Sequence, residues 1–92
     1  MVHAAIALTD AITVKVGGVK NASGDHAVAA DLLEEVVAVD TEGRKAIGHL
    51  RSILEEKNLV SYSGQVYRQE DIRRMARHLA RYHAWARQFL VL

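Results

Sequence analysis

The sequence contains no cysteine and no proline, and both absences narrow what the chain can be. Without cysteine there is no disulfide framework, and no metal ion can be held by thiolates. Without proline, nothing in the sequence forces a helix to break. Aromatic residues make up only 5% of the chain. Alanine and leucine are frequent instead, and this balance favours helix.

Long apolar segments are also missing. No apolar run approaches the roughly 20 residues that a membrane-spanning helix needs, and the first residues lack the pattern of a signal peptide. We therefore expect a cytoplasmic protein that does not contact membranes. The chain has 92 residues, half of them apolar and a quarter charged, which is typical of one globular domain over residues 1–92. A chain this small buries a modest core, and dimerisation often adds to it.

What the sequence does contain is a strongly amphipathic segment, residues 69–92. Its apolar residues recur at alternating spacings of three and four, which predicts a helix with one buried face: Ile72, Met75, Leu79, Tyr82, Ala86 and Phe89. The opposite face carries four arginines, Arg73, Arg74, Arg77 and Arg81. His83 falls near the centre of the apolar stripe, so we expect it to be a hydrogen-bonded core or interface residue.

Charge is divided unevenly along the chain. Residues 68–92 hold six arginines against two acidic residues, a net charge of +4, whereas residues 1–67 hold six basic against nine acidic residues, a net charge of −3. An arginine-rich face can meet nucleic acid, or it can lie against the acidic surface of a neighbouring chain. Surface charge on an amphipathic helix is usually just solvated, and we take that as the first interpretation.

Weaker patterns predict three further helices. The first covers residues 2–16, although 12–16 also alternates like a strand. The second begins after a cap at Ser23 or Asp25, and the third runs from about residue 42 to residue 57 and ends at Asn58. Gly43 and Gly48 in this third helix indicate close approach of a neighbouring backbone. Residues 59–68 break the helical period and predict a loop or a small hairpin. The fold class is therefore all-α, an antiparallel four-helix bundle.

The sequence carries no motif for catalysis, metal binding or a cofactor. Among the five histidines, His78 and His83 lie roughly 140° apart on a helix, which is poor geometry for joint ligation. His3 and Asp10 share a helix face, and we interpret them as a structural pair rather than an acid–base unit. No glycine-rich phosphate loop is present. We therefore expect neither metal nor cofactor, and a protein that is not an enzyme.

Three stretches together resemble a known family. They are residues 3–11, Asp25-His26 followed by Ala30, Leu32 and Leu33, and the closing half from Leu54 to Asn58, Tyr62, Tyr67 and the helix over 70–86. Their order is similar to that of small HEPN-like domains, prokaryotic all-α proteins often coupled to toxin–antitoxin and nucleotidyltransferase systems. The resemblance implies a helical domain that works with a second protein.

The same resemblance bears on ribonuclease activity. Active HEPN ribonucleases carry an Arg-Asn pair with a histidine a few residues later, and the corresponding segment here has Lys57, Asn58 and then Tyr62. Lysine lacks the planar guanidinium group with which arginine binds phosphate through two hydrogen bonds. A phenol is a poor acid or base at neutral pH because its pKa lies near 10. Both departures argue against cleavage.

Three functions follow from these observations. The first is a non-catalytic interaction domain that acts as a homodimer, with a nucleotidyltransferase or toxin as a possible partner and with Tyr82, Trp85 and Phe89 as the contact. The second is an RNA-binding or RNA-cleaving domain that uses Lys57, Asn58, Arg73, Arg77, His78 and Arg81. The third is a winged-helix DNA-binding domain, with residues 59–67 as the wing, but the acidic residues of the third helix oppose it.

Overall fold

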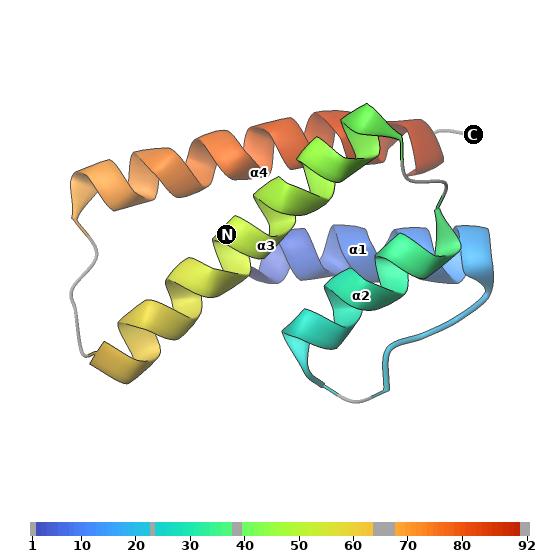
Figure 1. Ribbon diagram of the computed structural model, residues 1–92, viewed down its shortest axis with the longest axis horizontal. Coiled ribbons are helices and arrows are strands. Elements are labelled where there is room, and N and C mark those ends of the chain that lie inside the picture. Colours follow the sequence, from blue (N-terminus) through green and yellow to red (C-terminus); the bar gives the residue numbers. More distant parts are fainter. Residues whose placement is uncertain (1, 23, 38–39, 64–67, 91–92) are drawn as a thin grey trace.

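The chain folds into four helices (Figure 1). They are α1 (Val2–Gly17), α2 (His26–Val36), α3 (Thr41–Ser63) and α4 (Gln69–Leu90). This computed structural model describes the backbone of residues 2–22, 24–37, 40–63 and 68–90, and the side chains of the same ranges except 56–63. No strand occurs within these ranges. The predicted all-α four-helix bundle is confirmed, and α1 is helical through residues 12–16 rather than ending in a strand.

The helices do not all alternate in direction. α3 runs antiparallel to α2 and α4, whereas α1 runs in the same direction as both of these neighbours (Figure 1). The carboxyl ends of α1 and α2 meet so closely that a Cβ atom on Gly17 would lie 2.4 Å from the Cγ1 atom of Val36. The long connection over 18–25 makes this possible, because its residues can span about 26 Å. A helix of 16 residues is about 24 Å long.

Aspartates cap the starts of the last three helices. The carboxylate of Asp25 accepts a hydrogen bond from the amide of Ala27 at 2.9 Å, and that of Asp40 accepts one from Gly43 at 2.7 Å. The Arg68 amide donates to Asp71 at 3.0 Å. Each bond satisfies an amide that has no partner within its helix. Asp25 is therefore the cap of α2, and the alternative, Ser23, lies outside the described residues.

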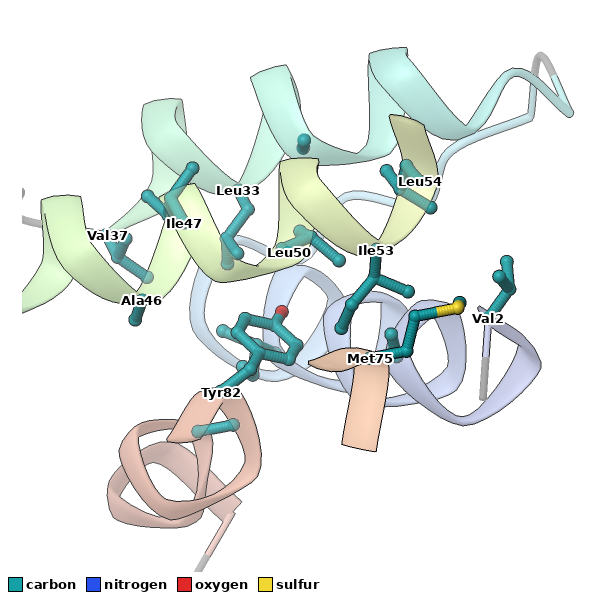
Figure 2. Packing of buried hydrophobic residues seen from close by; sticks show 14 residues of the cluster. Val2, Leu33, Val37, Ala46, Ile47, Leu50, Ile53, Leu54, Met75 and Tyr82 are labelled. Atoms are coloured by element: carbon teal, nitrogen blue, oxygen red, sulfur yellow. The ribbon is translucent and has the colours of Figure 1, made fainter. Parts of the chain in front are cut away.

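One core joins the four helices (Figure 2). Its largest fully buried side chains include Tyr82 of α4, Ile12 of α1, Leu33 of α2, and Leu50 and Ile53 of α3. Polar groups inside this core are paired. Thr9 donates its hydroxyl proton to the carbonyl of Ala5 at 2.8 Å, and the Tyr82 hydroxyl lies 2.6 Å from the Thr9 oxygen. Because a threonine hydroxyl has one proton, Tyr82 is the donor in the second bond.

Two sequence expectations about α3 are wrong. Residues 59–63 continue α3 instead of forming a loop or hairpin, so Asn58 does not end the helix; residues 64–67 of the expected segment lie outside the described residues. Extending an existing helix by one turn costs less than starting a new two-stranded element, which outweighs the β preference of Val60 and Tyr62. This removes a strand that the winged-helix alternative needs. Gly48 is exposed with no atom within 4 Å of a built Cβ, so no backbone packs closely against it.

Candidate functional site

The most distinctive polar contact of the molecule joins α3 to α4. The Nδ1 atoms of His49 and His78 lie 2.8 Å apart, and both side chains are half-buried. The ring centres are 5.1 Å apart, close to the largest separation that such a nitrogen contact allows, so the two nitrogens point almost directly at each other. This is the geometry of a hydrogen bond, in which one ring donates its proton and the other accepts it.

A groove runs beside this pair between the same two helices. It has a volume of about 670 Å³, and its lining includes Lys45, His49, Arg81 and Trp85. Asp40 and Glu42 line it as well. The carboxylate of Asp40 holds the amide of Gly43, and Glu42 lies 3.7 Å from Lys45 in an exposed ion pair. The groove therefore has a carboxylate end at the start of α3 and a histidine and arginine end further along.

Positive charge acts on the histidines at that second end. Burial, the adjacent His78 and the guanidinium of Arg81 together lower the pKa of His49 below its ordinary value. Each of these influences penalises a charged imidazole. The neutral form of His49 is thus favoured, and we assign His49 as the acceptor of the shared hydrogen bond. A cation would meet the same positive surroundings, which disfavours a metal ion between the two rings.

The aromatic residues of α4 form a ladder beside the groove. Trp85 stacks on Tyr82 with ring centres 5.9 Å apart and meets the edge of Phe89 at 4.9 Å. Tyr82 is completely buried. Burial raises its pKa to about 12, and the nearby Asp10 carboxylate acts in the same direction. Tyr82 therefore presents no surface to a second chain, contrary to the expectation of a contact through Tyr82, Trp85 and Phe89. Trp85 and Phe89 pack partly against the core.

The four arginines that the helical pattern places opposite the apolar stripe, Arg73, Arg74, Arg77 and Arg81, are exposed as predicted. Arg74 binds Asp71 at 2.7 Å. Arg81 lines the groove with His49, whereas Arg73 and Arg77 lie on the outer surface of α4. The structure thus brings His78 and Arg81 together with His49. His49 was not among the candidate residues, and no local signal could reveal it, because it lies 29 residues from His78 in the chain.

The other side of α4 has an entirely different character. A shallow apolar groove of about 510 Å³ lies between α1 and α4, lined by Ala4, Leu8, Ala76, Leu79, Ala80 and His83. His83 is exposed at this groove rather than buried in the core. Of the two expectations, a core or an interface histidine, the core one is wrong. The buried face of α4 is formed by Met75, Tyr82 and Ala86, and residue 83 lies about 100° away from Tyr82 around the helix. The interface role stays a prediction.

The apolar groove continues onto the outer surface of α1. The solvent-facing positions of this helix include Ala4, Ala7, Ala11 and Val14, which are all exposed, with the exposed His3 and Lys15 at the edges of this strip. The side chain of Val14 is 50% exposed. The opposite face of α1 is buried through residues such as Ala5 and Ile12. α1 thus carries apolar residues on its buried side and along the middle of its exposed side, and apolar residues on two sides are typical of a helix that is covered on both. We call the groove and these α1 positions the alanine surface.

The remaining candidates are not joined into a site. The side chains of Lys57 and Asn58 lie outside the described residues, and only their backbone, within α3, is described. No hydrogen bond links His3 to Asp10 among the described side chains, and His3 is exposed. Over the described residues, no group of three or more histidine, aspartate or glutamate side chains is placed to hold a metal ion.

Comparisons of the chain with protein-family models, with curated proteins and with solved structures found no match. In the ranges that the structure describes, no helix combines the length and the apolar character that crossing a membrane requires.

Proposed function

We propose that the protein is a non-catalytic helical interaction domain that acts as a homodimer through its alanine surface. The observation that carries the proposal is the apolar outer face of α1, where Ala4, Ala7, Ala11 and Val14 are all exposed. Covering apolar surface contributes about 25 cal/mol per Å². In a chain with a small core, a second copy supplies that cover.

The shape of the alanine surface suits a second copy of itself. A dimer interface with two-fold symmetry brings the same patch of both chains together, so the patch must carry both a ridge and a groove. The exposed alanines of α1 lie beside the α1/α4 groove, and we expect them to act as the ridge. Alanine side chains allow helices to approach at the short end of the usual 8–10 Å range of interaxial distances. Each ridge can therefore enter the groove of the other chain.

Charge favours one orientation of the two copies. α1 lies between α4 and α2 (Figure 1), so a two-fold axis parallel to α1 places α4 of one copy opposite α2 of the other. α4 exposes Arg73 and Arg77, whereas α2 exposes Glu35. Opposite charges at the rim of an interface steer association and set its orientation. The uneven charge of the chain is then matched between copies.

Sedimentation and charge reversal test this arrangement. We expect the wild-type protein to be dimeric at tens of micromolar, well above the dissociation constant of a stable dimer. Glu35→Arg and Arg77→Glu should each weaken the dimer, and the double variant should recover part of the loss. A wild-type protein that sediments only as a monomer would refute the homodimer. A dimer that ignores both reversals would refute this orientation.

The resemblance to HEPN-like domains extends the proposal to partners and cellular setting. On that basis the dimer works in the prokaryotic cytoplasm, beside a partner such as a nucleotidyltransferase or a toxin. Lys57 and Tyr62, which stand where active members have arginine and histidine, support a role without RNA cleavage. An adjacent gene for such a partner would support this part of the proposal, and an unrelated neighbour would count against it.

Weak RNA binding is the second candidate, and one observation favours it. His49, His78 and Arg81 converge at the α3/α4 groove, with Arg77 exposed on the neighbouring outer surface of α4. These groups can touch phosphates, although Asp40 and Glu42 at the other end of the groove oppose a polyanion. Filter binding with mixed RNA tests the candidate, and Arg77→Ala should weaken any binding observed.

A further inference from the structure

We propose that His49 and His78 form a proton-operated clasp that holds α3 against α4 at neutral pH and releases it in mild acid. This goes beyond the proposed dimer, since it concerns the inside of each chain and does not depend on the alanine surface. The direct contact of the two Nδ1 atoms at 2.8 Å carries the inference.

The clasp has three protonation states. With both rings neutral, one Nδ1–H donates to the other Nδ1. One added proton at the far nitrogen of the donor ring keeps this bond and makes it charge-assisted, which strengthens it. A second added proton must occupy the accepting nitrogen itself. The two facing N–H groups then have no acceptor between them, and two like charges lie side by side, so the contact must open.

The surroundings determine how easily the last proton is added. From α4, Arg81 adds positive charge near His49, and from α3 the nearest cation lining the groove is Lys45. The carboxylates of Asp40 and Glu42 line the other end of the groove, about 10–14 Å nearer the start of α3 than His49. α2 packs against α3 as well, but its Asp31 and Glu34 both bind Arg51 at 2.8 and 2.9 Å. The charge closest to the clasp is thus positive.

The position of the clasp gives its opening a structural consequence. α3 and α4 are the helix pair with the most extensive contact in the molecule, and only the half-buried histidines contribute an ionisable hydrogen bond across it among the described side chains. Trp85 lines the same groove and is the single tryptophan of the chain. Its fluorescence therefore reports on the α3/α4 contact directly.

A double-mutant cycle at two pH values tests the clasp. His49→Ala, His78→Ala and the double variant would be unfolded with urea at one protein concentration, near pH 7.5 and near pH 5, with Trp85 fluorescence as the signal. We expect the pair to favour folding about three- to tenfold near pH 7.5, and this coupling to vanish or reverse near pH 5. Coupling that is absent near pH 7.5, or equal at both pH values, would overturn the proposal.

Nuclear magnetic resonance of the wild-type protein provides a second test that needs no variant to fold. The imidazole signals of His49 and His78 should shift together and in two steps as the pH falls. Independent single-step titration of His49 and His78 would contradict the clasp. A His83→Ala control should leave the two-step behaviour of the pair unchanged.

Discussion

The side of α4 that faces α3 and the side that faces α1 carry opposite kinds of side chain. Towards α3, the flank carries His78, Arg81 and Trp85, and its contacts are a hydrogen bond, a charge and stacked rings. Towards α1, it lines the apolar groove with Ala76, Leu79 and Ala80, and His83 is the one residue of that lining whose side chain can form a hydrogen bond. Both flanks border a groove, but the first groove is lined largely by polar and charged side chains, whereas the second is lined mainly by apolar ones.

This difference indicates what each side is suited to do. A polar contact between helices depends on protonation and can be switched by pH. A surface of alanines has no such dependence and is suited to permanent cover by another apolar surface. We therefore assign association to the α1 side of α4 and response to acid to its α3 side.

Tyr82 lies beneath both flanks, so its removal should have the largest effect. It is fully buried, and Tyr82→Ala should lower the free energy of unfolding by about 3–5 kcal/mol, since it leaves a cavity between α1 and α4. Tyr82→Phe removes only the hydroxyl that donates to Thr9 and should cost about 1 kcal/mol. Urea unfolding measures both. Equal losses for the two variants would mean that the ring itself contributes little.

Alkaline pH tests the same residue without a large cavity. The pKa of Tyr82 is about 12 in the folded chain and near 10 when unfolded. The unfolded state thus loses its proton first, and stability that is complete below pH 10 declines as the pH rises towards 12. We expect the free energy of unfolding to fall by about 1–3 kcal/mol over this pH range. Urea unfolding at several pH values between 10 and 12 measures the fall. Tyr82→Phe should remove that contribution, and an unchanged alkaline loss in this variant would contradict it.

Acid should act only on the α3 side of α4. Because the pKa of His49 is lowered in the folded chain, the unfolded chain takes up a proton first as the pH falls below about 6.5, and stability declines. The urea midpoint of the wild-type protein should therefore fall in mild acid. His49→Ala should show a shallower decline, while Ala80→Ser, on the other flank, should match the wild type. If the wild type and His49→Ala lost stability equally as the pH falls, His49 would not be the source of the acid response.

RNA binding should show the smallest effect. The arginines of α4 can contact phosphates only at an exposed surface, so any affinity should fall steeply as salt increases. We expect no cleavage of mixed RNA by the wild type, by Tyr62→Phe or by His78→Ala. Cleavage that is lost only in His78→Ala would instead make the α3/α4 groove an active site. Cleavage lost only in Tyr62→Phe would point to the tyrosine.

Local pattern accounts for much of the fold and little of the candidate sites. The spacing of Met75, Tyr82 and Ala86 predicts the buried face of α4, because helical periodicity is a local property. Ile72 belongs to the same stripe yet is 46% exposed, since the core does not extend to the first turn. The direction of α1 depends on where the connection over 18–25 leads, which no short-range pattern encodes.

The sites depend on packing between distant segments. His78 is visible in the sequence as a residue at the edge of the α4 stripe, but its partner His49 becomes identifiable only once α3 crosses α4. The alanine surface was hidden for another reason. The alanines of α1 predict a helix, but they do not show which face of that helix is buried. The structure shows that Ala5 and Ile12 are buried, whereas Ala4, Ala7 and Ala11 are exposed.

The central claim is that the alanine surface is the dimer interface, and a matched pair of alanines tests it most directly. Ala11→Glu places a charge on that surface, whereas Ala84→Glu places the same charge at an exposed position of the α3/α4 groove. Both sites are helical and exposed, so the cost to each folded chain is small. Sedimentation equilibrium should find Ala84→Glu as dimeric as the wild type and Ala11→Glu at least about tenfold weaker. A dimer that survives Ala11→Glu and dissociates with Ala84→Glu would contradict the account.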